Sequence, residues 1–214
     1  MTGKRLNMPA GEEGDKILHP IRSIKEVAMS LSRRHFLLLS AAAALPARAA
    51  TIPRPATPDF SINLPNGSKL PLKQFRGKVV AMTFINTNCP HCQEVTKALT
   101  EIQKEYGPKG VQVVMSAMDD NAAVHVPVFI QRFRPSYPVG WNDRDAALDF
   151  LQIPVMVPGY VPKMAFIDRE GVIRAQYAGE DAFFKTPAAS IRAEIDKMLK
   201  SAAPARKKST RKKQ

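Results

Sequence analysis

The stretch VVAMTFINTNCPHC, residues 79–92, decides the fold of this chain. Its first half, Val79–Ile85, is a continuous apolar run, as expected for a strand that is buried on both faces. Its end, Cys89-Pro90-His91-Cys92, contains the only two cysteines among 214 residues. Apolar residues at helical spacing follow as far as Tyr106. Two cysteines at the first turn of a helix, directly after a buried strand, predict a site for reversible thiol–disulfide exchange.

The spacing of the two cysteines favours redox chemistry over two alternatives. A helix N-terminus and the adjacent His91 both stabilise a thiolate at Cys89. A purely structural disulfide over so short a loop would constrain the unfolded chain very little. A structural zinc site needs more ligands than this pair supplies, and the sequence has no second cysteine pair.

Residues 1–49 have the features of an export signal. The segment Ser32-Arg33-Arg34-His35-Phe36-Leu37-Leu38 resembles a twin-arginine signal, and it leads into the apolar stretch 36–45. Ala47-Arg48-Ala49 fits a cleavage site, so we expect cleavage after Ala49 and a periplasmic or exported protein. The long lead before the arginines suggests Met29 as the true start. The alternative is an uncleaved helix on the membrane surface.

The formal charge of +13 belongs mostly to the two ends of the chain. Residues 1–49 carry +4 and residues 201–214 carry +6, which leaves +3 for residues 50–200. We expect the tail 201–214 to be disordered, because it has no apolar periodicity. Such a tail would either make a weak contact with an anionic surface, such as lipid headgroups, or remain solvated without a partner. No nucleic-acid partner is expected.

The remaining chain divides into a proline-rich stretch, 50–57, predicted to be a linker, and a domain over 58–200. Strand–helix–strand units in this domain predict a parallel sheet covered on both faces, and a final hairpin adds antiparallel strands. The expected strands are 60–64, 69–72, 79–85, 111–117, 137–140, 163–168 and 172–177, and the expected helices are 89–106, 119–133, 143–151 and 186–199.

Several short motifs match one family in order and spacing. They are Pro58-Asp59-Phe60, Gly77-Lys78-Val79-Val80, the Cys89–Cys92 site, Val161-Pro162 and Phe166-Ile167-Asp168-Arg169-Glu170-Gly171. Together they resemble the exported thioredoxin-like proteins of the TlpA/ResA group, which are redoxin (AhpC/TSA-related) proteins. The resemblance covers most of the domain. It implies a thioredoxin-like three-layer α/β/α sandwich, an α/β fold with an N-terminal β-hairpin extension and a mixed central sheet.

The resemblance also implies roles for four residues. Cys89 would be the exposed nucleophile and Cys92 the buried resolving thiol. Pro162 would be the family's cis-proline, which faces the disulfide. Val161 would offer backbone hydrogen bonds to an incoming cysteine-containing segment.

The residues around Cys89 bear on the stability of its thiolate. The Pro90-His91 pair also occurs in DsbA-like strong oxidants, and a hydrogen bond or positive charge from His91 would stabilise the reduced state. Asn88 replaces the family's usual tryptophan. Its amide would either contact the thiolate or cap the helix, and the cap is the favoured interpretation, because asparagine is a preferred N-cap residue.

Two carboxylates usual in this family are missing from their positions. Thr83 stands where thioredoxin has a buried aspartate, and Val95 stands where many TlpA/ResA proteins have a glutamate. Glu94 lies one residue before that position, on a different helix face. The resemblance therefore leaves open how the thiol of Cys92 is activated.

The sequence thus predicts an exported thiol–disulfide oxidoreductase that needs no cofactor beyond the Cys89–Cys92 disulfide and no metal. Its partners would be other exported proteins with thiols or disulfides, together with a membrane electron-transfer partner. Pro90-His91 favours an oxidant, whereas the resemblance favours a reductant. The alternatives are a peroxiredoxin-like peroxidase, although Asn86 stands where that family has threonine or serine, and a copper-binding chaperone of the SCO type, whose cysteines are one residue further apart.

Overall fold

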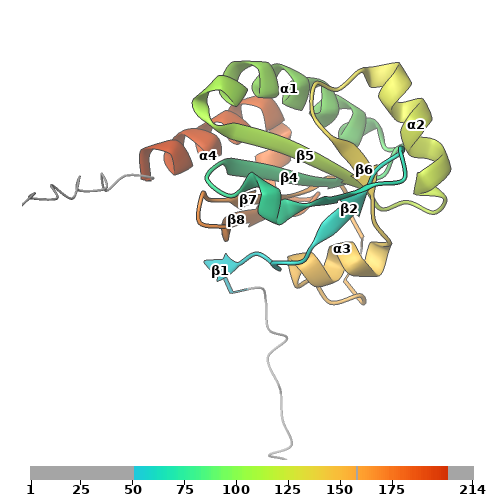
Figure 1. Ribbon diagram of the computed structural model, residues 1–214, viewed down its shortest axis with the longest axis horizontal. Helices are drawn as coiled ribbons and strands as arrows, with labels where there is room; N and C mark the ends of the chain where they lie inside the picture. The colour runs from blue at the N-terminus through green and yellow to red at the C-terminus, as the bar shows by residue number, and fades with distance from the viewer. Residues whose placement is uncertain (1–50, 158, 202–214) are drawn as a thin grey trace, which may run out of the picture. The chain divides into compact units, whose positions relative to one another are not determined.

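The apolar run that the sequence singled out forms β4 (Val79–Ile85), and every residue of this strand is buried. The computed structural model describes residues 51–157 and 159–201. In this part of the chain the strands form one sheet in the order β1-β8-β7-β4-β5-β6-β2-β3 (Figure 1). β4 pairs in parallel with β5 (Val111–Ala117) and antiparallel with β7 (Lys163–Ile167). The sheet is therefore mixed, as predicted.

Two hairpins extend the sheet. β7 continues into β8 (Val172–Tyr177), and β2 (Ser61–Asn63) pairs with β3 (Lys69–Pro71), both antiparallel. The sequence predicted these hairpins. It did not predict that β2 joins the sheet through β6 (Val139–Trp141). Gly140 permits this junction, because a Cβ atom there would lie 2.1 Å from the carbonyl oxygen of Asn63.

The prediction of a linker over residues 50–57 is wrong for part of that stretch. Arg54–Pro55 form β1, which pairs antiparallel with β8 at one edge of the sheet. Arg54 is buried, and its Nη2 donates hydrogen bonds to the Phe150 carbonyl oxygen (2.8 Å) and to Gln176 Oε1 (3.1 Å). These bonds hold a proline-rich segment whose sequence gives no strand pattern. Proline is tolerated here because β1 lies at the edge of the sheet.

Helices cover both faces of the sheet, which gives the predicted three layers (Figure 1). The buried side chains of α1 (Pro90–Tyr106), α2 (Ala122–Phe133) and α4 (Pro187–Ser201) share one apolar core with the sheet. On the opposite face, α3 (Arg144–Leu151) and the 3-10 turn η1 (Leu72–Phe75) share a second core with the sheet and the N-terminal hairpin. Two further 3-10 turns are η2 (Gly107–Lys109) and η3 (Ala182–Lys185).

Three aromatic rings fill the centre of the second core. Phe150 of α3 lies 4.3 Å from Phe60 and 5.6 Å from Phe84 between ring centroids. Phe60 and Phe84 meet edge to face at 6.0 Å. This cluster joins α3 and the N-terminal extension to the central strand β4, so the extension is an integral part of the packed domain.

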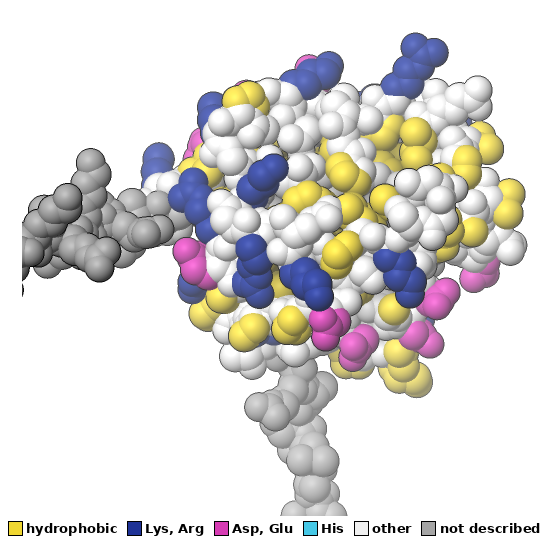
Figure 2. All heavy atoms as spheres, in the orientation of Figure 1, with side chains coloured by type: hydrophobic (Ala, Val, Ile, Leu, Met, Phe, Trp, Pro, Cys, Tyr) yellow, Lys and Arg dark blue, Asp and Glu magenta, His cyan; other side chains and the backbone are white. Residues whose placement is uncertain are grey.

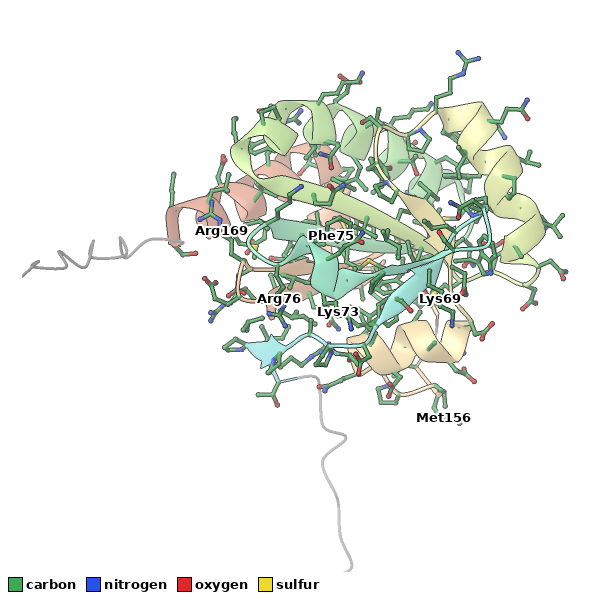
Figure 3. All side chains as sticks on the ribbon, in the orientation of Figure 1. Lys69, Lys73, Phe75, Arg76, Met156 and Arg169 are labelled. Carbon is green, nitrogen blue, oxygen red and sulfur yellow. The ribbon has the colours of Figure 1, made fainter. Side chains whose placement is uncertain are left out.

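The face formed by the hairpin β2–β3 and η1 is basic. Figure 2 shows several Lys and Arg side chains on this face, and Figure 3 labels Lys69, Lys73 and Arg76 there. All three side chains are exposed. Lys73 approaches Asp59 at 3.7 Å, but both groups are largely exposed to solvent, so this ion pair contributes little to stability.

Some predictions lie outside the described residues. These are the export signal over 1–49, the start at Met29 and the predicted disordered tail 201–214 apart from Ser201. The prediction is wrong for Ser201, which is the last residue of α4. Within 51–157 and 159–201, no helix is both long enough and apolar enough to cross a membrane. α2 begins at Ala122 and runs through Pro127 to Phe133.

Candidate active site

The two cysteines lie at the beginning of α1. Cys89 is the N-cap residue and is half-buried, whereas Cys92 lies in the first turn and is completely buried. Pro90 occupies the first helical position, where its missing N–H costs no hydrogen bond. Both cysteines are free thiols in this structure. Of the two cysteines, Cys89 is the less buried, as the family resemblance implied.

The prediction that Asn88 caps this helix is wrong. The N-cap residue is Cys89, and no side chain there accepts a capping hydrogen bond. The backbone N–H of Cys89 instead donates to the carbonyl oxygen of Asn86 at 3.1 Å. Because Pro90 fixes the first helical position, the helix begins one residue too late for an Asn88 cap. The Asn88 side chain is exposed to solvent.

A proline loop faces the cysteines, as the family resemblance implied. The bond between Val161 and Pro162 is cis. The Cys89 Sγ atom lies 3.9 Å from the carbonyl oxygen of Val161, across 72 positions of sequence. Gly179, just beyond β8, allows the chain to pass this loop closely. A Cβ atom at position 179 would lie 2.8 Å from the carbonyl carbon of Tyr160 and 2.9 Å from the nitrogen of Val161.

A groove runs beside the cysteines. Its wall includes His91 and Glu94 from α1, Tyr160 and Pro162 from the loop, and Phe184 from η3. His91 is exposed in this wall, so its effect on the Cys89 thiolate stays a prediction. The loop before Pro162 presents apolar side chains to solvent. Among them, Met156 is 90% exposed and is labelled in Figure 3, and Tyr160 is 58% exposed.

A hydrogen-bond network that the sequence did not predict supports the loop before Cys89. Asp119 accepts hydrogen bonds from the backbone N–H of Thr87 (2.8 Å) and from its hydroxyl (2.9 Å). His125 of α2 contacts the Oδ2 atom of Asp119 through Nδ1 at 3.0 Å. Gln93 Nε2 donates to the carbonyl oxygen of Thr87 at 3.1 Å. The one signal in the sequence is that Asp119 stands two residues after a buried strand, β5.

Burial raises the pKa of the Cys92 thiol well above its ordinary value. A backbone hydrogen bond from Asn86 acts in the opposite direction, and Cys89 and Asp119 add smaller upward contributions. Thr83 is also buried, and its hydroxyl has no partner in the described part of the chain. Cys92 is therefore held as a neutral thiol, in keeping with a resolving role.

No group of three or more histidine, cysteine, aspartate and glutamate side chains in the described ranges is arranged to hold a metal ion. His91 and His125 lie on different helices, α1 and α2. His125 contacts Asp119. The arrangement around Cys89 and Cys92 is chemically suited to sulfur exchange, since one sulfur is accessible and the second lies one helical turn further along.

The sequence of this chain matches a known protein family. The model of the Redoxin family matches residues 54–189, which is more than half of the chain. The chain belongs to the Redoxin family. The resemblance to TlpA/ResA-like redoxins is thereby confirmed, and the chain is a thioredoxin-like oxidoreductase.

Curated relatives and solved structures agree with this assignment. The thiol-disulfide oxidoreductase ResA of Bacillus thuringiensis is 27% identical over 124 residues, which cover 58% of this chain and 68% of ResA. The thioredoxin-like protein YneN of Bacillus subtilis is 28% identical over 123 residues, covering 57% and 69%. A thiol:disulfide interchange protein of the thioredoxin family from Chlorobium tepidum has a TM-score of 0.57 at 22% identity, covering 71% of this chain and 99% of that one. A thiol:disulfide interchange protein from Bacteroides sp. has a TM-score of 0.56 at 18% identity, covering 75% and 97%. These structures show the thioredoxin-like fold.

Proposed function

We propose that this protein is an exported thiol–disulfide oxidoreductase that exchanges a Cys89–Cys92 disulfide with the thiols and disulfides of other exported proteins. One observation carries the proposal. A half-buried cysteine begins a helix, faces the Val161 carbonyl oxygen at 3.9 Å and is followed, one turn later, by a fully buried cysteine. The name of ResA, a thiol-disulfide oxidoreductase, supports the same chemistry.

The exchange proceeds in two displacement steps. In the reducing direction, the Cys89 thiolate attacks a substrate disulfide, forms a mixed disulfide and releases one substrate thiolate, which takes up a proton. The Cys92 thiol then loses its proton and attacks the Cys89 sulfur, which releases the second substrate thiolate. The protein gives up two electrons and two protons and ends as the Cys89–Cys92 disulfide. The oxidising direction is the reverse sequence.

The groove beside Cys89 would receive the substrate. A cysteine-containing segment lying extended along Val161 would exchange backbone hydrogen bonds with it in the manner of an added β-strand. Pro162 would place that segment against the two sulfurs. His91, in the wall of the groove, would donate a hydrogen bond to the Cys89 thiolate, and Asn88, exposed beside it, remains a second candidate for such a contact.

The direction of exchange follows from the reduction potential of the pair. A value near about −120 mV, that of DsbA, identifies an oxidant that introduces disulfides. A value near about −270 mV, that of thioredoxin, identifies a reductant, which would need a membrane electron donor. The basic tail after Ser201 would add at most a weak contact with an anionic surface.

Cysteine variants test the proposal. Cys92→Ser should form a stable mixed disulfide with a disulfide substrate, because the resolving thiol is gone, and should turn over slowly. Cys89→Ser should neither form that adduct nor turn over. The measurement is mass spectrometry of the adduct beside a turnover assay of disulfide reduction. Full turnover by Cys89→Ser would rule out the proposed nucleophile.

A further inference from the structure

Asp119 lies at the same end of the sheet as the two cysteines. β4 and β5 run in parallel with Ile85 opposite Ala117, so both strands leave the sheet at one edge. Beyond this pair, the N–H of Met118 donates to the carbonyl oxygen of Ile85 at 2.9 Å. The segments that follow, one leading to Cys89 and the other beginning with Asp119, therefore start side by side.

The carboxylate of Asp119 is directed at the segment before Cys89. Its two oxygens accept the N–H and the hydroxyl of Thr87 at 2.8 and 2.9 Å, only two residues before the proposed nucleophile. The Asp119 side chain is 14% exposed, so water screens its charge poorly. His125 contacts this carboxylate at 3.0 Å, and its side chain is 41% exposed. Arg144 lines the same pocket as Asp119.

A negative charge in this place acts differently on the two redox states. Once Cys89 ionises, the dithiol state carries a thiolate, whereas the disulfide state has no charge on sulfur. A fixed carboxylate nearby therefore destabilises the dithiol state relative to the disulfide state. The upward contribution of Asp119 to the pKa of Cys92 has the same sign. Glu94 and Asp120 are exposed, and they are not among the groups that shift Cys92.

We infer that Asp119 lowers the reduction potential of the Cys89–Cys92 pair and so favours the reductant direction, against the predicted effect of Pro90-His91. This inference rests on the proposed function. Asp119 is a positioning residue that acts on the sulfurs through its charge and through Thr87, not by contact with the substrate.

The test is the equilibrium constant between the protein dithiol and glutathione, measured in the full mature chain, residues 50–214, at pH 9.5, above the ordinary thiol pKa of about 8.5, so that a thiolate is present in the dithiol state. Asp119→Asn removes the charge and keeps an oxygen that accepts the Thr87 N–H. The constant should shift about 3- to 10-fold toward the dithiol, where tenfold corresponds to about 30 mV. Asp120→Asn is the matched control, because it removes the same charge one residue away, and it should leave the constant unchanged.

Two further variants separate charge from structure. Thr87→Val removes a hydrogen bond to Asp119 but leaves the carboxylate, and its shift should be less than half that of Asp119→Asn on a logarithmic scale. His125→Lys places a permanent cation beside Asp119 without touching Thr87, and should shift the constant in the same direction as Asp119→Asn. If Asp119→Asn does not fold, His125→Lys tests the effect of the charge in its place.

The outcomes distinguish the two proposals. A wild-type protein with no measurable equilibrium overturns the proposed function, and this inference falls with it. A measurable wild-type constant that Asp119→Asn and His125→Lys leave unchanged overturns this inference alone. A shift in Thr87→Val as large as that in Asp119→Asn shows that the loop, not the charge, sets the potential, and also overturns it.

Discussion

Replacing Gly179 with alanine tests whether the position of Val161 controls exchange. The added Cβ atom would lie 2.8 Å from the carbonyl carbon of Tyr160 and 2.9 Å from the nitrogen of Val161. Both neighbours are backbone atoms, which cannot rotate away as a side chain does. Position 179 has no left-handed backbone conformation, so the substitution acts through this contact and not through strain in φ.

The contact distances set the size of the effect. Non-bonded carbon atoms prefer about 3.5 Å or more, so the loop would have to move by roughly 0.7 Å. A displacement of about 1 Å of a positioning group can cost about a hundredfold in rate, and we expect about a tenfold loss in kcat/KM for disulfide reduction. Overpacking of this kind costs about 1–3 kcal/mol of stability.

The assay is reduction of a cysteine-peptide disulfide, with thermal unfolding measured in parallel. Gly159→Ala is the matched control, because its nearest neighbour is the Nη2 atom of Arg144, at 3.2 Å on a flexible side chain. It should keep most of the activity. If Gly179→Ala retains full kcat/KM while the protein is folded, the loop is not held by this contact and the reasoning fails.

Three further predictions concern stability. Phe150→Ala empties the centre of the aromatic cluster with Phe60 and Phe84. It should lower the free energy of unfolding, measured in urea, by about 3–5 kcal/mol, and a loss below about 1 kcal/mol would contradict the packing described. Arg54→Ala leaves the Phe150 carbonyl oxygen without its buried donor and should cost about 1–3 kcal/mol, whereas an unchanged unfolding midpoint would mean that β1 contributes nothing. Burial and the neighbouring Glu194 raise the pKa of Tyr177 to about 12. Because the folded state holds this proton more tightly than the unfolded state, whose tyrosines titrate near pH 10, stability is fully present below about pH 10 and is lost as the pH rises toward about 12, by up to about 2 kcal/mol. Tyr177→Phe should remove this part of the pH dependence, and identical pH profiles for both proteins would refute the assignment.

The fold was predictable where the pattern is local. Six of the seven residues of β4 are apolar, a pattern that favours a strand buried on both faces, and the bounds of that strand agree with the prediction. The hairpin of β7 and β8 was predictable for the same reason, since Gly171 at φ 78 supplies the left-handed conformation that its turn requires. The family motifs also placed Val161-Pro162 opposite the cysteines, which no local pattern shows.

The features that the sequence did not predict depend on contacts that a single sequence does not display. The residues of β1 have no alternating pattern and so predict a linker, whereas in the structure Arg54 holds this strand through hydrogen bonds to Phe150 and Gln176. Asp119 and Thr87 lie 32 positions apart, and only the parallel pairing of β4 and β5 brings them together. The Asn88 cap failed because proline at position 90 outweighs the capping preference of asparagine.

Both edges of the sheet are built in a way that discourages unwanted association. β1 has two residues and β3 has three, and each contains a proline and a basic residue, Arg54 with Pro55 and Lys69 with Pro71. A proline cannot donate a backbone hydrogen bond, and very short, charged edges are poor templates for a foreign strand. Under the proposed function, this protein would bind extended, cysteine-containing segments, which can themselves pair as strands. With the sheet edges blunted in this way, such a segment would be directed to the groove at Val161 instead of adding to an edge of the sheet.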